Sequence, residues 1–315
     1  MLSSVLTLFS GIGTFIIGMK LIASNLDAVA GGRVEELFKK ISDSKLAGIG
    51  IGVGSAAVLQ SSSATTVILV GLVNSGIINL FQATCIIMGA NIGTTFTALL
   101  ISFNSLPIGE LFAFLAFLGA IIIIGAKHSK SKTIGYLIGS AGLMFIGLDI
   151  IKLSATSLNE YSAFTNLFSS VNSPFIMLGI GLVFTAIIQS SSAITGIVIT
   201  LAHLGIMPAV GAFYIIMGGN IGSCATAMLA SIGGNLNAKR TALINLAFNT
   251  IGVIIFLPLT IAFGNKIVNA LRGLSISVVI AYFHIAFNLI TTVLMIPFIK
   301  KLADLSCILI ADNAN

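Results

Sequence analysis

Two long stretches of the chain, residues 46–109 and 161–238, contain no Asp, Glu, Lys or Arg. A helix that spans a bilayer needs about 20 apolar residues, so each stretch can supply several membrane segments. Only 8% of the 315 residues are charged, against roughly 25% in soluble domains. The composition therefore disfavours soluble enzymes and nucleic-acid-binding proteins. The apolar runs are continuous, unlike the alternating strands of about ten residues in an outer-membrane barrel. We predict an all-α, polytopic protein of the lipid bilayer.

The basic residues, the cysteines and the N-terminus give further expectations. The net charge is +6, but most Lys and Arg residues lie in short loops, so membrane topology explains them better than nucleic acid does. The three cysteines, at positions 85, 224 and 307, have neither metal-ligand spacing nor the pattern of a disulfide framework. The N-terminus lacks a basic segment, so we expect no cleaved signal peptide.

The chain also repeats itself. QSSSATT at 60–66 matches QSSSAIT at 189–195, and IIMGANIG at 86–93 matches IIMGGNIG at 215–222. The offset is identical in both cases, since the shift from position 60 to position 189 equals the shift from 86 to 215. Because the offset stays constant over this length, the pattern indicates a duplicated unit rather than a chance similarity.

The duplication predicts how the chain is organised. The first repeat covers residues 1–130 and the second covers 131–264, and residues 265–315 form an extra transmembrane helix and a short cytoplasmic tail. Spanning helices are expected near 2–25, 82–103, 108–126, 133–152, 209–231, 241–264 and 273–299.

The segments 46–75 and 175–206 do not fit a single crossing. Thirty helical residues would measure about 45 Å, and the hydrocarbon core is about 30 Å thick. Each is therefore either one tilted helix or a re-entrant hairpin. With hairpins the main basic loops all fall on one face, as the positive-inside rule requires. We predict hairpins, an N-terminus outside and a C-terminus in the cytoplasm of a cell-membrane protein.

The hairpin interpretation has a consequence for the relation between the repeats. The first repeat then contains an odd number of full crossings, so the second repeat is upside down relative to the first. Inverted-topology repeats of this kind are common in secondary transporters.

A Gln-Ser-Ser-Ser motif marks the tip of each predicted hairpin. Irregular backbone inside a bilayer is tolerated only when it is buried in protein or faces a water-filled cavity. Helix N-termini after the tips suit an anion, whereas carbonyl, amide and hydroxyl oxygens suit a small cation such as Na⁺. Small residues can also serve helix packing. Two copies favour a binding site, because each precedes its Asn-Ile-Gly by the same interval, from 60 to 91 and from 189 to 220. The predicted substrate-binding residues are Ser61, Ser62, Ser63, Thr65, Thr66, Ser190, Ser191 and Ser192.

A second pair of polar segments follows, at 89–95 and 218–223. Their glycines and Asn-Ile-Gly sequences predict an interrupted helix in each repeat, and paired breaks in transporters point to ion sites. The alternative is that these glycines allow close packing of helices. The predicted Na⁺-binding residues are Gln60, Asn91, Thr94, Thr95, Gln189, Thr195, Asn220 and Ser223.

Several isolated polar residues have two interpretations each. Lys20 and Asp149 occupy equivalent positions, and charges inside membranes are functional candidates. We expect both near helix ends, with their side chains reaching the interface. Asn249, His284 and Asn288 either line the cavity or bridge helices.

The duplicated QSSS motif, each copy followed by a G-x-N-I-G-T-like segment, resembles the sodium-dependent phosphate cotransporter family in its prokaryotic branch. NAKRTALINLAFN at 237–249 and YFHIAFN at 282–288 are similar to further family segments, and the resemblance covers nearly all of residues 1–300. It implies a Na⁺-coupled symporter of inorganic phosphate rather than an enzyme. The hairpin-tip serines are then expected near phosphate and Na⁺, with no other cofactor.

The chain departs from the family pattern at three places. The family often has His where this chain has Asn245, and Ser223-Cys224 replaces the usual Thr-Thr. Many bacterial members carry a long soluble regulatory region after the membrane part, whereas this sequence ends at Asn315. We therefore expect no regulation through such a region.

The duplicated polar segments within charge-free sequence lead us to the hypothesis of alternating access around the two tips, with bound Na⁺ offsetting the charge of phosphate. Three alternatives stay open: a transporter of another small anion or polar solute, a passive channel, and an intramembrane serine hydrolase. The hydrolase is least favoured, because a nucleophilic serine needs a positioned base, for which His203 and His284 are the candidates. The chain also lacks the G-x-S-x-G motif that marks the nucleophile of many serine hydrolases.

Overall fold

The computed structural model of the chain describes residues 2–41, 43–102, 109–159, 161 and 173–311. Within these ranges the regular secondary structure is helical, and six helices are long and apolar enough to cross a membrane. The predicted all-α, polytopic class is confirmed at this level.

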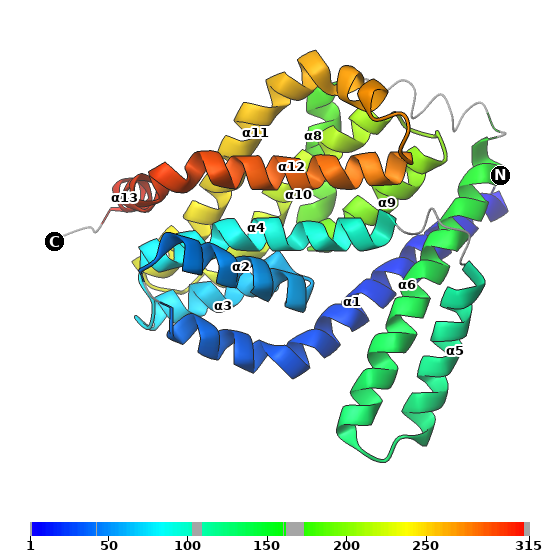
Figure 1. Cartoon of the computed structure of the whole chain (residues 1–315), viewed down its shortest axis with the longest axis horizontal. Coiled ribbons are helices and arrows are strands. Elements are labelled where there is room, and N and C mark those ends of the chain that lie inside the picture. Colours follow the sequence, from blue (N-terminus) through cyan, green and yellow to red (C-terminus); the bar gives the residue numbers. More distant parts are fainter. Residues whose placement is uncertain (1, 42, 103–108, 160, 162–172, 312–315) are drawn as a thin grey trace.

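The helices follow the same order twice. The first series is α1 (Leu2–Lys39), α2 (Lys45–Leu59), α3 (Ser62–Asn74), α4 (Leu80–Ser102) and α5 (Gly109–Gly125). The second is α6 (Ser129–Asn159), α8 (Pro174–Ile188), α9 (Ser191–His203), α10 (Ala209–Ala230) and α11 (Leu236–Ala270). The chain then forms α12 (Ile276–Met295), the 3₁₀ turn η2 (Ile296–Phe298) and α13 (Ile299–Leu309) (Figure 1). Both α8 and α9 begin and end at the positions that the sequence offset predicts from α2 and α3, so the offset is kept in the structure.

Each of the two hairpin segments forms a pair of short helices joined at a glutamine. The 15 residues of α2 or α8 reach only about 22 Å. Gln60 and Gln189 have φ angles of 51° and 56° and are the two non-glycine residues with positive φ in the described part of the chain. Left-handed backbone costs a non-glycine residue about 1–2 kcal/mol. The same strained turn is therefore maintained at both tips by the surrounding structure.

The interrupted-helix prediction is wrong, because α4 and α10 are continuous through both Asn-Ile-Gly sequences. Their glycines instead let a hairpin helix approach closely. A Cβ atom on Gly89 would lie 2.0 Å from the carbonyl oxygen of Ile49 in α2. One on Gly218 would lie 1.9 Å from that of Leu178 in α8. The paired glycines thus serve helix packing, the alternative that their sequence left open.

Helices α1 and α6, which occupy equivalent places in the two repeats, pack against each other in opposite directions. Gly11 lies against Ile151, whereas Gly18, farther along α1, lies against Met144, earlier on α6. Figure 1 shows the two helices crossing, with α5 and α6 projecting beyond the other helices. This pair of equivalent helices is therefore antiparallel.

Four predicted spans differ from the helices. The spans 133–152 and 241–264 lie inside the longer helices α6 and α11. The first helix, expected to end near residue 25, continues to Lys39 because Val34 and Phe38 are buried in a core cluster with residues of α2, α3 and α4. The last predicted span, 273–299, is divided after Met295 because Pro297 cannot donate a helical hydrogen bond.

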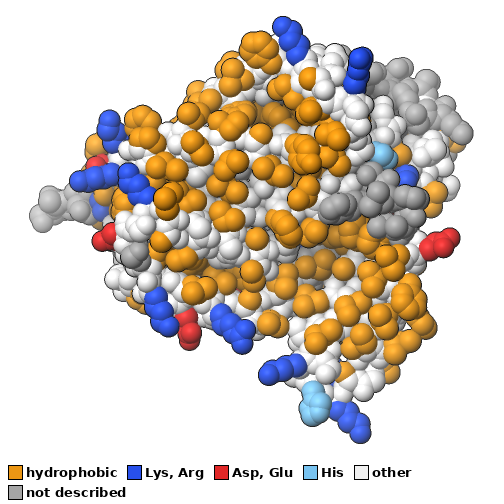
Figure 2. All heavy atoms as spheres, viewed as in Figure 1, with side chains coloured by type: hydrophobic (Ala, Val, Ile, Leu, Met, Phe, Trp, Pro, Cys, Tyr) orange, Lys and Arg blue, Asp and Glu red, His pale blue; other side chains and the backbone are white. Residues whose placement is uncertain are grey.

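The outer surface is strongly apolar. Large hydrophobic side chains such as Ile124, Leu153 and Ile254 are 85%, 70% and 66% exposed. Figure 2 shows hydrophobic side chains over the middle of one face, with Lys and Arg side chains gathered toward its margins. This arrangement suits a protein surrounded by lipid, with its charges at the two interfaces.

Candidate functional site

The two glutamine-serine tips meet at one cavity of about 90 Å³, which we call the tip cavity. It is lined by Met19, Lys20, Ala23, Gln60, Ser61, Ser62, Ser63, Thr94, Gln189, Ser190, Ser191 and Ser192. All eight residues of the two QSSS motifs are therefore brought together. Pockets for drug-sized ligands measure about 300–1,000 Å³, so this cavity suits a small inorganic ion better.

The serines of each motif have different structural roles. The hydroxyls of Ser61 and Ser190 cap the following helices, accepting hydrogen bonds from the N–H groups of Ala64 at 3.1 Å and Ala193 at 3.2 Å. The next serines, Ser62 and Ser191, are only 8% and 9% exposed. Their hydroxyls make no hydrogen bond within the described part of the chain, so both are available to a ligand.

Four helix ends also face the tip cavity. Helices α3 and α9 begin there, so their unpaired N–H groups and partial positive charges favour an anion. Helices α2 and α8 end there, and the carbonyl groups at a helix C-terminus favour a cation. The backbone alone thus provides for ions of both signs within one small space.

The two tip glutamines differ in their contacts. Gln60 Oε1 accepts a hydrogen bond from Thr97 Oγ1 at 2.7 Å, and its Nε2 donates to the carbonyl of Ala57 at 2.8 Å. In the second repeat Gln189 is exposed. The hydroxyl of Thr226, which corresponds to Thr97, is buried without a hydrogen-bond partner among the described residues. Gln60 is therefore held by its neighbours, whereas the equivalent contact in the second repeat is open.

The second repeat contains another unpartnered buried hydroxyl. Thr185 is fully buried, and its Oγ1 has no hydrogen-bond partner among the described residues. The same Oγ1 would lie 3.1 Å from a Cβ atom added to Gly219. The first repeat has Ala56 at this place. Neither Thr185 nor Thr226 lines the tip cavity, but both are unpartnered buried hydroxyls of the second repeat, and the sequence reasoning singled out neither. Thr226 could have been found from the sequence, because the offset between the repeats aligns it with Thr97.

The remaining predicted residues lie outside the set that lines the tip cavity. The hydroxyls of Thr65, Thr66, Thr95 and Ser223 each donate to a backbone carbonyl of their own helix region. Asn91 does the same through its amide, and Thr195 is buried. Of the predicted ion-binding residues, the structure brings Gln60, Gln189 and Thr94 to the cavity, and the Thr94 hydroxyl has no partner among the described residues.

Buried amides connect three helices of the second half. Asn220 on α10 donates to Asn288 Oδ1 on α12 at 2.8 Å, and Asn288 donates to the carbonyl of His284 at 3.0 Å. Asn249 on α11 contacts Cys224 Sγ at 3.4 Å. None of Asn249, His284 and Asn288 lines the tip cavity. Asn288 and Asn249 link neighbouring helices in this way, whereas both imidazole nitrogens of His284 are buried with no hydrogen-bond partner among the described residues.

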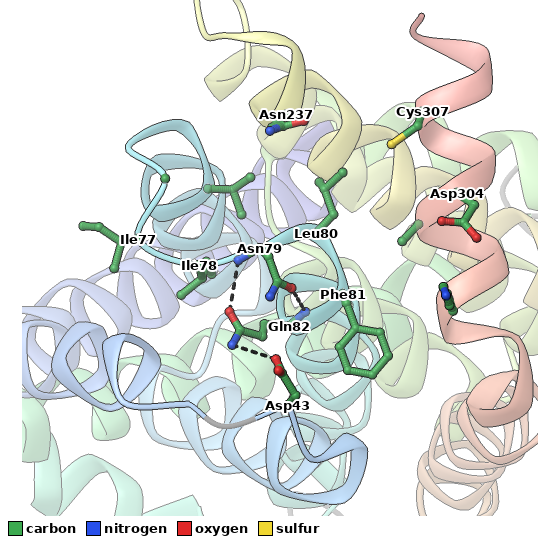
Figure 3. A pocket seen from close by; sticks show the side chains of 14 residues that line it. Asp43, Ile77, Ile78, Asn79, Leu80, Phe81, Gln82, Asn237, Asp304 and Cys307 are labelled. Carbon is green, nitrogen blue, oxygen red and sulfur yellow. Dashed lines mark hydrogen bonds between the residues drawn. The ribbon is translucent and has the colours of Figure 1, made fainter.

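A larger cavity of about 940 Å³ lies between the α3–α4 connection and α13 (Figure 3). Here Asn79 and Gln82 cap the start of α4 reciprocally, and the Gln82 amide donates to Asp43 Oδ1 at 3.1 Å. The second repeat has Pro208 in place of Asn79. These polar groups have partners and are not duplicated, so we assign them to helix capping.

Comparison with known proteins identifies the relatives of this chain. YjbB of Salmonella typhimurium, named as a candidate inorganic phosphate export protein, is 28% identical over 98% of this chain and 56% of its own length. The uncharacterized protein YqeW of Bacillus subtilis is 31% identical over 90% of this chain and 91% of its own length. The sodium-dependent phosphate transport protein 2A of Rattus norvegicus is 39% identical over 79 residues, 24% of this chain and 12% of its own length.

The chain spans only about half of the length of YjbB. No solved structure gives a significant match. The profile of the Na⁺/Pi-cotransporter family matches residues 14–153 and 157–280, which is most of the sequence. On this evidence, and with its duplicated QSSS tips meeting at one cavity, the chain belongs to the Na⁺/Pi-cotransporter family.

Proposed function

We propose that this protein transports inorganic phosphate across the cell membrane by Na⁺-coupled symport, with the tip cavity as its binding site. The observation that carries the proposal is the convergence of both QSSS motifs on one cavity of about 90 Å³. Family membership and the names of the relatives support phosphate as the substrate.

The chemistry of the cavity agrees with a phosphate ion. Phosphate carries roughly two negative charges near neutral pH, and its transfer into hydrocarbon without compensation is prohibitive. The hydroxyls of Ser62 and Ser191 and the N–H groups that begin α3 and α9 would replace its water shell. A bound Na⁺ would offset part of the charge.

Buried oxygen atoms of the second repeat form the best candidate for Na⁺ binding. The unpartnered hydroxyls of Thr185 and Thr226 and the carbonyl groups that end α8 are hard, uncharged ligands. In the first repeat Thr97, the counterpart of Thr226, is already bonded to Gln60, and Ala56 stands in place of Thr185. We therefore place the coupling ion in the second repeat.

Antiparallel packing of α1 and α6 supports inverted repeats, with both hairpins re-entrant and the tips near the bilayer midplane. The charge distribution favours an N-terminus outside and a C-terminus in the cytoplasm. Alternating access then requires one repeat to rock against the other around the shared tips.

A transport assay tests the function directly. Purified protein in liposomes with an inward Na⁺ gradient should accumulate labelled phosphate above its equilibrium level, and K⁺ in place of Na⁺ should abolish this accumulation. Phosphate uptake at the same rate with and without Na⁺ would refute the proposed coupling to Na⁺. Uptake that stops at equilibrium would indicate a channel, and strong competition by sulfate or dicarboxylates would indicate another substrate.

Export is the second candidate, because YjbB is named for outward phosphate movement. Liposomes preloaded with phosphate distinguish the two directions. An inward Na⁺ gradient should slow phosphate efflux by a symporter, which moves both ions in the same direction. Efflux that is faster with this gradient than without it would favour export and would contradict symport.

Replacing Thr226 by valine should separate ion binding from structural support. Because its hydroxyl has no partner among the described residues, Thr226→Val should leave stability in Na⁺-free detergent unchanged or higher by about 1 kcal/mol. The Na⁺ concentration for half-maximal uptake should rise about tenfold, as expected when roughly 1.4 kcal/mol of binding is lost. Thr97→Val is the matched control and should cost about 1 kcal/mol of stability, because it removes the bond to Gln60. Unchanged Na⁺ activation in Thr226→Val would exclude Thr226 as a ligand.

A further inference from the structure

The tip cavity contains one full charge. Of the described residues that line it, Lys20 alone is ionisable, and the others are hydroxyl, amide or apolar side chains. Helix N-termini contribute only partial charge, equivalent to about half a unit each. A site built for a multiply charged anion thus has a single cationic side chain.

Lys20 does not lie where the sequence suggests. Its sequence neighbours predict a position near a helix end, with the ammonium group reaching the membrane interface. Because α1 extends from Leu2 to Lys39, Lys20 lies at the middle of a 38-residue helix. Its side chain is exposed, and ionisable residues within membrane segments usually face a cavity and carry function.

The fold gives Lys20 no ion-pair partner. No carboxylate within the described part of the chain lies within ion-pair distance of it. Asp27 is seven residues farther along the same helix, about 10 Å along its axis. The Lys20 ammonium group therefore forms no ion pair with another described residue and can interact with a bound anion.

A groove adjoins the tip cavity at this residue. It measures about 500 Å³ and is lined by residues of α1, among them Lys20 and Asp27, together with Leu59, Ser61 and Ala64 of the first hairpin. Lys20, Ala23 and Ser61 line both the groove and the tip cavity. Lys20 thus stands at the junction of a wider outer space and the small inner one.

The duplication does not supply a second cation. The residue equivalent to Lys20 in the second repeat is Asp149, which does not line the tip cavity. Gly18 of α1 packs against Met144, and Gly147 packs against Phe15. Along this contact Lys20 lies past Gly18 at one end, whereas Asp149 lies between Gly147 and Ile151 toward the other, and the two do not pair.

We propose that Lys20 is a phosphate-binding residue, whose ammonium group draws the anion from the groove into the tip cavity and supplies its one full countercharge. This assignment rests on the proposed transport of phosphate. It makes the site asymmetric, with the cationic side chain in the first repeat and the candidate Na⁺ ligands in the second.

The test compares charge-removing and charge-keeping variants in liposomes under an inward Na⁺ gradient. Lys20→Gln should raise the KM for phosphate at least tenfold, about 1.4 kcal/mol of lost binding, with a smaller change in maximal rate. Lys20→Arg should stay within about threefold of wild type. Lys266→Gln, which removes an exposed lysine of α11, is the matched control and should leave the KM unchanged.

A second readout does not depend on turnover. Equilibrium binding of labelled phosphate to the purified protein in Na⁺ should weaken by the same factor in Lys20→Gln. Lys20→Met, an uncharged variant with a similar stem, replaces Lys20→Gln where the latter yields too little folded protein. A wild-type-like KM and affinity in the uncharged variant would overturn the role of Lys20 and leave phosphate transport standing. Wild-type protein that neither binds nor transports phosphate would instead overturn the proposed function and the Lys20 assignment with it.

Discussion

Phosphate uptake should fall about hundredfold or more when Ser62 and Ser191 are both replaced by alanine. Their hydroxyls line the tip cavity, are almost fully buried and make no hydrogen bond within the described structure. A hydrogen bond to a charged group contributes about 1.5–3 kcal/mol, and about 1.4 kcal/mol corresponds to a factor of ten. Each single variant should therefore lose about tenfold or more in uptake measured at low phosphate concentration.

Two sets of controls distinguish ligand binding from loss of structure. Ser75→Ala changes a serine at the far end of α3, where the hydroxyl bonds only to nearby carbonyls, and should transport normally. Ser61→Ala and Ser190→Ala remove helix caps and should lower stability by about 1 kcal/mol each. Ser62→Ala and Ser191→Ala should unfold at the wild-type temperature. Full uptake in the Ser62 and Ser191 double variant would refute the tip cavity as the phosphate site.

Replacing Gly218 by alanine should prevent the second hairpin from packing correctly. The added methyl group would lie 1.9 Å from the carbonyl oxygen of Leu178 and 3.0 Å from the backbone nitrogen of Leu182. Backbone atoms cannot rotate away as a flexible side chain can, so α8 and α10 must separate. We expect a loss of about 3 kcal/mol or more, at the upper end of overpacking effects. Thermal unfolding in detergent and the yield of monodisperse protein measure it.

Another glycine of the same hairpin provides the matched control. An added Cβ on Gly179 of α8 would meet no atom within 4 Å. Gly179→Ala should therefore be neutral or stabilising by up to about 1 kcal/mol, because alanine loses less backbone entropy in a helix than glycine does. Gly89→Ala, the first-repeat counterpart, should behave like Gly218→Ala. Equal stability of Gly218→Ala and Gly179→Ala would show that the close approach of α8 to α10 is not required.

Features that depend on composition and local spacing could be predicted from the sequence. The charge-free stretches 46–109 and 161–238 indicated a membrane protein because each is far too apolar for a solvated surface. The constant offset between the matching motifs indicated two repeats and paired tips before any contact was known. The QSSS motifs could be chosen as candidates because two copies of one polar pattern in apolar sequence are hard to explain by packing alone.

Features that depend on which residues meet could not be predicted in this way. A glycine permits both a helix break and a close helix contact, and only the backbone of α2 beside Gly89 and of α8 beside Gly218 decided for contact. The same holds for the serines, since adjacent and chemically identical hydroxyls divide into helix caps and free groups according to where the helix begins.

The position of Lys20 shows the same limit. Its sequence neighbours indicated a helix end, but burial of Val34 and Phe38 extends α1 and leaves the lysine at mid-helix beside both tips. The sequence by itself determined the membrane class, the duplication and the polar motifs, because these depend on residues close together in the chain. The tertiary structure alone decided the common cavity, its single cation and its unequal halves, because these depend on contacts between residues far apart in sequence.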